Sequence, residues 1–192
     1  QFPMGERDQF TVWAGPRIEN YYMLASAPSI YKPVLKQFAL GGNAGAYAAS
    51  TDGGFGIAWT QPVDDPTQPR FAVSTNYVSK GATNSSQADT NTTGGGIFTD
   101  TQSKWLTKVE YGAPRWQISF AVAAENCKDT NVNGADDSCK AWQGYYATAK
   151  GDDAGEGNAT SYSMRAYWKP EDVGLMPALQ VGYDIRNIDD AD

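Results

Sequence analysis

Histidine is missing from this 192-residue chain, and cysteine occurs only twice. Without histidine, neither a Ser-His-Asp triad nor a histidine-ligated metal centre can form, which removes a large share of enzyme mechanisms. The sequence also lacks a G-x-S-x-G elbow, a phosphate-binding P-loop and an H-E-x-x-H zinc motif. We therefore predict no catalytic residues, no cofactor and no enzymatic activity.

Long hydrophobic runs and an excess of basic charge are missing as well. No apolar run approaches the roughly 18–20 residues of a transmembrane helix. The formal net charge is −7, which argues against nucleic acid as a partner because a phosphate backbone needs a basic surface. Neither end carries a recognisable targeting segment, and both read as cuts through a longer protein. We therefore expect an internal fragment.

What the sequence does contain is strict alternation of apolar and polar residues. The clearest case is the stretch 104–125, where two such runs flank the turn signal Gly112-Ala113-Pro114-Arg115. Because side chains alternate across a strand, this pattern predicts an antiparallel hairpin. Each strand is about nine residues long, near the ~9–11 that a tilted membrane-crossing strand needs. Trp105, Tyr111 and Trp116 lie near the ends of the apolar faces, as in the aromatic girdles of outer-membrane barrels.

Other alternating runs and the connections between them extend this interpretation. Five more strands are predicted at 9–15, 55–60, 70–78, 161–169 and 177–186. Long connections at 16–54, 79–103 and 126–160 alternate with short ones at 61–69, 112–115 and 170–176. Outer-membrane barrels pair short periplasmic turns with long extracellular loops, whereas a soluble sandwich has no reason to segregate its loops. The prediction is a single all-β domain over 1–192, part of an antiparallel transmembrane β-barrel, with about seven or eight strands of a larger barrel.

A family resemblance points the same way. The residues FTVWAGPRIENYYMLASAPSIY from Phe10 and KPVLKQFALGG from Lys32, with 53–59, 70–81 and 161–183, resemble the barrel of cyanobacterial Som-type porins. These belong with the OprB-like carbohydrate-selective porins, often labelled iron uptake porins. The most specific piece is Gly15-Pro16-Arg17 followed by Asn20-Tyr21-Tyr22-Met23-Leu24, and the similarity covers most of the chain.

The resemblance implies a trimeric channel in the outer membrane for passive uptake of small hydrophilic solutes and inorganic ions. The expected partners are the lipid bilayer, those solutes and two further copies of the chain. Family members usually also carry a signal peptide, an S-layer-homology domain and a coiled coil. Their absence here agrees with the expected fragment.

Two groups of charged residues are candidates for the channel itself. Arg17, Lys32 and Lys36 would line a constriction if the connection 16–54 folds into the pore, where fixed charge sets ion preference; alternatively, this segment packs in a trimer interface or caps the barrel wall. The candidate pore-lining residues are Lys104, Lys108, Glu110, Arg165, Lys169, Asp184 and Arg186. Basic residues outnumber acids there, which favours a lumen tolerant of anions, unless these residues pair and only hydrate the wall.

The long connection 126–160, expected to be extracellular, holds two further candidates. Cys127 and Cys139 bracket a polar loop, which predicts a disulfide in an exported protein; its closure contributes roughly 3 kcal/mol. The residues Asp129, Asn131, Asn133 and Asp136 match the start of an EF-hand-type calcium loop. Lys140 occupies the position where such a loop needs a bidentate glutamate, so a solvated loop is the favoured interpretation and no metal is predicted.

Two rival functions stay open on the sequence alone. The first is a soluble extracellular β-sandwich that binds carbohydrate or a cell surface through its aromatic-rich loops. The second is a secreted glycosidase that uses two carboxylates, Glu19 and Glu110. The face that carries Trp116, Ile118 and Phe120 separates barrel from sandwich, because it meets lipid in the barrel and a second sheet in the sandwich.

Overall fold

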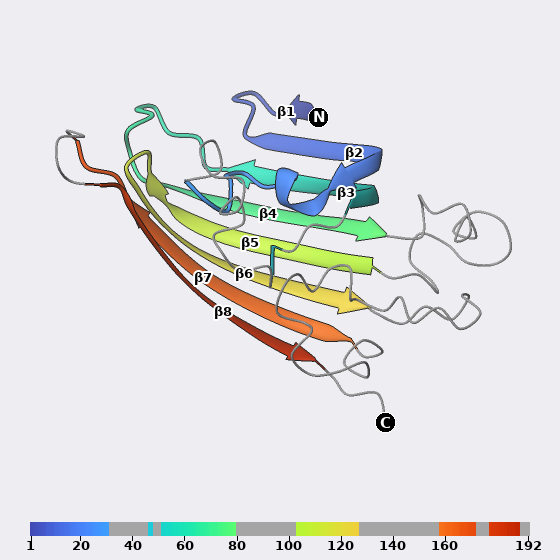
Figure 1. Ribbon diagram of the computed structural model, residues 1–192. Coiled ribbons are helices and arrows are strands. Elements are labelled where there is room, and N and C mark those ends of the chain that lie inside the picture. The colour runs from blue at the N-terminus through green and yellow to red at the C-terminus, as the bar shows by residue number, and fades with distance from the viewer. Residues whose placement is uncertain (31–45, 48–50, 80–102, 127–157, 172–176, 189–192) are drawn as a thin grey trace, which may run out of the picture.

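A computed structural model describes residues 1–30, 46–47, 51–79, 103–126, 158–171 and 177–188. Eight strands form one antiparallel sheet in the order of the sequence, β1 to β8, and the sheet is strongly curved (Figure 1). The elements are β1 (Phe2–Met4), β2 (Phe10–Glu19), the short 3-10 helix η1 (Asn20–Tyr22), β3 (Thr51–Thr60), β4 (Arg70–Ser79), β5 (Ser103–Ala113), β6 (Trp116–Asn126), β7 (Ala159–Trp168) and β8 (Leu179–Ile188). The predicted all-β antiparallel fold is confirmed. The described strands form an open sheet with β1 and β8 at its edges.

The predicted bounds of the first long connection are wrong at both ends. The sequence placed it at 16–54, but β2 continues to Glu19 and β3 already begins at Thr51. Pro16 fits inside β2 because the register shifts between Gly15 and Ile18, and such a bulge needs no ladder N–H from proline. Gly54 belongs to β3, where it pairs with Val78 of β4. The position needs glycine because an added Cβ would lie 2.5 Å from the carbonyl oxygen of Tyr77. The connection therefore spans residues 20–50.

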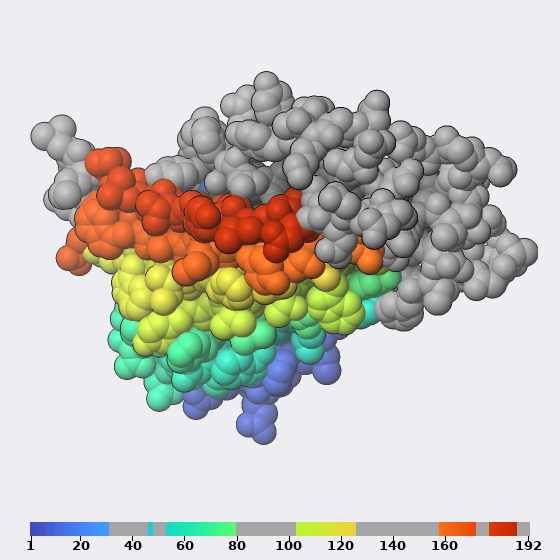
Figure 2. Space-filling view, turned by 90° about the horizontal axis from the view of Figure 1, so that it is seen from below, coloured from blue at the N-terminus to red at the C-terminus, as the bar shows by residue number. Residues whose placement is uncertain are grey.

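The two faces of the sheet differ in an unusual way. One face, called the outer face, carries the apolar alternating positions, and most of them are exposed, for example Val181 and Tyr183 at 67% and Ile118 at 54%. The opposite, inner face carries the charged positions, and they are buried, with Lys104 at 0% and Lys108 at 1% exposure. A water-soluble protein distributes these residue types the other way round. Figure 2 shows the strands following one another as a continuous surface from red β8 to the blue N-terminal strands.

The inner face is covered by the segment that follows β2. Residues 20–30, called the strap, begin with η1, which lies against β3 and β4 (Figure 1). Met23 packs in a buried cluster with Trp13, Ala58 and Val78. A second buried cluster contains Leu24, Ala46, Tyr47, Leu106, Ala121 and Ala123. Both buried apolar clusters of the described residues therefore lie on the inner face, where the strap and residues 46–47 pack against the sheet.

Candidate functional site

The inner face of β5 to β8 carries a set of buried ion pairs. Lys104 and Glu125 are register partners on β5 and β6, with Nζ 2.8 Å from Oε1. Arg186 on β8 reaches the other oxygen of Glu125 at 2.6 Å. Arg165 on β7 contacts Asp184 on β8 at 3.2 Å, and Lys108 pairs with Glu110 on the same strand. The register places charged residues of neighbouring strands side by side, so that they pair and form one charged surface.

Ser26 joins the strap to this surface. Its hydroxyl donates to Glu110 Oε2 at 2.8 Å and accepts from Lys108 Nζ at 2.7 Å. The same ammonium also donates to the Ser26 carbonyl at 3.1 Å. Gln117 on β6 donates from Nε2 to the Ser26 hydroxyl at 3.2 Å. One serine thus contacts side chains of two neighbouring strands in a mostly buried network.

Further hydrogen bonds fix the strap on both sides of Ser26. The Ala25 backbone N–H donates to the Ser74 hydroxyl on β4 at 2.8 Å. The Ile30 N–H donates to Gln180 Oε1 on β8 at 2.9 Å. Near η1, the Asn76 side-chain amide donates to the carbonyl of Asn20 at 3.0 Å. The strap therefore crosses the inner face from β4 to β8.

Two tyrosines of the connection are shielded by this arrangement. Burial raises the pKa of Tyr47 to about 12, although the positive charge of Arg165 acts in the opposite direction. The Arg165 guanidinium carbon lies 4.7 Å from the centre of the Tyr47 ring, a cation–π contact. The pKa of Tyr21 is also raised, first by burial and then by its hydrogen bond with Glu19. Both phenols are therefore neutral at ordinary pH.

The structure brings most of the predicted charged residues together. Lys104, Lys108, Glu110, Arg165, Asp184 and Arg186 all lie on the inner face. Lys169 follows the end of β7 at Trp168; its side chain is exposed, and its ammonium lies 5.1 Å from the ring centre of Tyr167. Whether these residues line a pore stays a prediction.

The remaining predicted site residues lie on β2 or outside the residues that the structure describes. Arg17 lies in the bulged part of β2 with an exposed side chain, and Glu19, the proposed partner of Glu110 in a glycosidase, ends the same strand. Outside the described residues lie Lys32, Lys36, Cys127, Cys139, Asp129, Asn131, Asn133 and Asp136. The constriction and the disulfide therefore stay predictions, as does the solvated loop expected in place of a calcium site.

Sequence reasoning missed several residues of this surface. Glu125 could have been included, since it shares the alternating face of Gln117 and Ser119 on the same strand. Gln180 lies on the inner face of β8 and could have been found in the same way. Ser26 gave no signal, because nothing in the local sequence indicates which strands the strap crosses.

The outer face carries aromatic side chains near both ends of the strands. Near the short turns lie Phe10, Trp59, Phe71, Tyr111, Trp116 and Trp168. Near the long connections lie Phe55, Tyr77, Trp105 and Tyr162. Neighbouring rings touch, with centroids 4.4 Å apart for Phe71 and Tyr111 and 5.7 Å apart for Tyr77 and Trp105. Aliphatic residues such as Val73, Val109 and Ile118 fill the band between these two aromatic rows.

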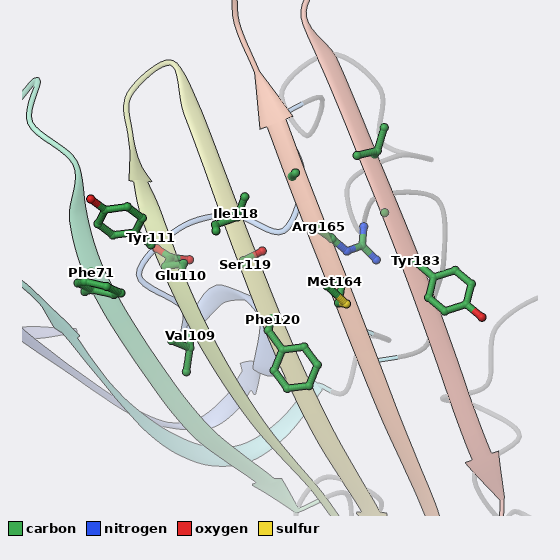
Figure 3. Close-up of a pocket in the computed structure, with 13 residues that line it drawn as sticks. Phe71, Val109, Glu110, Tyr111, Ile118, Ser119, Phe120, Met164, Arg165 and Tyr183 are labelled. Atoms are coloured by element: carbon green, nitrogen blue, oxygen red, sulfur yellow. The ribbon is translucent and has the colours of Figure 1, made fainter.

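A shallow hollow of about 590 Å³ lies within this band (Figure 3). It extends over β4 to β8, and its walls include Phe71, Tyr111, Ile118, Phe120, Met164 and Tyr183. The apolar side chains form its walls, while Glu110, Ser119 and Arg165 approach only from the inner side of the sheet. The hollow therefore suits a hydrocarbon chain better than a polar ligand.

Comparison of the chain with family models, curated proteins and solved structures gives no match. In the described part of the chain, no helix is long and apolar enough to cross a membrane. Among the same residues, no group of three or more His, Cys, Asp or Glu side chains is placed to hold a metal ion. The resemblance to porins thus stays a prediction.

Proposed function

We propose that this chain forms part of the wall of an outer-membrane β-barrel porin, a passive channel for small hydrophilic solutes and inorganic ions. The observation that carries the proposal is the inversion of the two faces. Ile118, Met164 and Tyr183 are exposed on the outer face, while Lys104, Lys108 and Glu125 are buried on the inner face. Lipid-facing apolar residues and lumen-facing polar residues alternate in this way along the strands of outer-membrane barrels.

The free energy of burying apolar side chains favours a membrane over water around the outer face. Fully burying one side chain such as Val181 or Met164 contributes roughly 1.5–3 kcal/mol, and in water the outer face forfeits this contribution at many positions. An aqueous sandwich would recover it with a second sheet. However, every strand that the structure describes belongs to the same sheet. A bilayer covers the outer face without further strands and places the aromatic rows at its two interfaces.

The strap supports a channel with a restricted lumen. It lies over the inner face, between the wall and the space that the curved sheet encloses, and hydrogen bonds from Ala25, Ser26 and Ile30 hold it to four strands. A segment held in this way takes up cross-section that a solute would otherwise use. Restricted width together with a charged wall favours small hydrophilic solutes.

Conductance of the full-length protein in planar bilayers tests the proposal. We expect discrete current steps in KCl, and a reversal potential under a salt gradient that gives the ion preference. A matched preparation that is heat-denatured before reconstitution serves as control. A protein that stays monodisperse without detergent and gives no steps would contradict the porin and favour the carbohydrate-binding sandwich. Sedimentation in detergent tests the homotrimer that belongs to the same proposal.

A further inference from the structure

Two arginines on β7 and β8 carry hydrogen-bond donors that have no acceptor within the described part of the chain. Arg165 donates from Nη2 to both Asp184 oxygens and from Nε to Ser163, which leaves Nη1 unpaired. Arg186 donates from Nη2 to Glu125, which leaves Nε and Nη1 unpaired. The hydroxyl of Ser161 is buried without a partner as well. Every member of this group is able to donate a hydrogen bond.

The four unpaired atoms belong to one patch of the inner face. Ser161 and Arg186 are direct register partners across β7 and β8. Arg165 lies four residues along β7, but its guanidinium leans toward Asp184, the register partner of Ser163. The Arg165 guanidinium therefore lies about 7 Å from Ser161 along the strand, half the separation of the two backbone positions. Gly182, opposite Arg165, leaves room for the guanidinium to lie along the sheet.

Charge accumulates at the same place. Lys108 pairs with Glu110, and Arg165 pairs with Asp184, so these charges balance. Arg186 contacts the carboxylate of Glu125, which also pairs with Lys104. A buried guanidinium whose N–H groups lack acceptors is costly unless an anion compensates it. The patch thus combines buried positive charge with oriented donors.

We propose that Arg186, Ser161 and Arg165 form a binding site for a small oxyanion such as phosphate or sulfate. Guanidinium groups suit this chemistry because their planar N–H donors match oxyanion oxygens and stay charged. Arg186 keeps 17% of its side chain accessible, whereas Arg165 and Ser161 lie deeper, and the unpaired donors of all three are buried. The claim that the channel carries such an oxyanion rests on the proposed function. The claim that the patch binds an oxyanion does not require the protein to conduct.

Isothermal titration of the full-length protein in detergent with sodium phosphate, and separately with sodium sulfate, tests the site. We expect saturable binding that sodium chloride does not reproduce. Arg186→Gln should weaken it by roughly 10- to 100-fold, because hydrogen bonds to a charged group are lost, and Ser161→Ala by up to about tenfold. Arg115→Gln is the matched control, because Arg115 lies in the exposed turn and pairs with Glu171 at 3.3 Å; it should leave affinity unchanged.

Arg186→Lys separates donor geometry from charge alone. It keeps a cation beside Glu125 but removes Nε and Nη1, so we expect a loss of about tenfold or more; unchanged affinity would overturn the site as described. Circular dichroism shows whether each variant is folded, and Ser161→Ala keeps all charges if Arg186→Gln fails to fold. Wild-type protein that conducts but binds neither oxyanion refutes this site alone. Protein that binds phosphate without conducting refutes only the channel.

Discussion

The hydroxyl of Ser26 makes hydrogen bonds with Glu110, Lys108 and Gln117 at the same time. In a network of this kind each bond polarises the next, and the low local dielectric makes an unpaired member costly. Glu110 and Lys108 keep each other if Ser26 is truncated, but Gln117 loses its partner in the strap. Truncating Ser26 should therefore weaken the attachment of the strap to β5 and β6, while the backbone hydrogen bonds of Ala25 and Ile30 and the charges of the wall remain.

Ser26→Ala should lower the free energy of unfolding by roughly 1–3 kcal/mol, since it leaves buried polar groups without a partner. Urea unfolding of the full-length protein in detergent measures this loss. Gln68→Ala in the exposed turn between β3 and β4 is the control, and we expect a change within about 0.5 kcal/mol. Equal effects of the two substitutions would mean that Ser26 does not hold the strap.

Tyr47 makes stability depend on alkaline pH. Its folded pKa is raised by burial to about 12, above the unfolded value near 10. The stabilisation is therefore complete below pH ~10 and is lost as pH rises toward 12, because the unfolded chain deprotonates first. Tyr47→Phe removes this dependence, on the order of 2–3 kcal/mol.

Unfolding midpoints of wild type and Tyr47→Phe between pH 9 and 12 measure the difference. Tyr22→Phe is the matched control because the Tyr22 side chain is 54% exposed. Other buried tyrosines still respond to pH in all three proteins, so the slope difference between the two variants is the relevant quantity. Parallel curves for Tyr47→Phe and Tyr22→Phe would show that Tyr47 is not shielded as the structure has it.

At the scale of the element, the strands could be predicted because their two faces differ in chemistry. β5 and β6 alternate charged or small residues with large apolar ones, so type, facing and turn all followed from the sequence. β2 was harder because Val12 and Trp13 are both apolar. The register pairs Val12 with Ile57 on the outer face, and Trp13 faces inward, where it packs with Met23 of the strap. Such contacts between distant segments leave no trace in the local pattern.

The outer face of β6 gives the sharpest element-scale prediction. Ile118→Arg places a charge one outward position inside the aromatic row of Trp116, and a barrel in lipid should lose about 1–2 kcal/mol, between the cost at the bilayer midplane and that at the interface. On a water-exposed sheet the same change, at a side chain that is 54% exposed, should stay within about 0.5 kcal/mol. Urea unfolding from lipid vesicles distinguishes the two cases. Gln68→Arg in the exposed turn is the control, and equal stability of both variants would argue against lipid contact.

For the whole molecule, the sequence predicted which residues share the inner face but not how they combine. Alternation along each strand identified Lys104, Lys108, Glu110, Arg165, Asp184 and Arg186. The partners of these charges depend on register across strands, so the sharing of Glu125 by Lys104 and Arg186 could not be foreseen. The path of the strap depends on Ser74, Glu110 and Gln180 meeting one segment, and these residues are separated by long stretches of sequence.

The two aromatic rows yield a prediction about the position of the entire sheet in a membrane. Trp105 lies on the outer face, in the aromatic row near the long connections. Its indole N–H donates to the Thr75 hydroxyl at 2.9 Å. Trp13 is buried on the inner face against Met23. Tryptophan of a barrel girdle sits at the lipid–water interface. Trp105 should therefore be quenched by brominated lipids, most strongly when bromine lies near the headgroup, whereas Trp13 should not be quenched.

Variants that keep only Trp105 or only Trp13, with phenylalanine at the other tryptophans, make this measurable in vesicles. Trp13 is the matched control because it shares the protein and the bilayer but faces away from the lipid. If both variants are quenched equally, the sheet is not inserted with its outer face toward lipid. If Trp105 is quenched mainly by bromine near the chain ends, the aromatic rows do not mark the interfaces. Only the expected depth profile agrees with strands that cross the bilayer between the two rows.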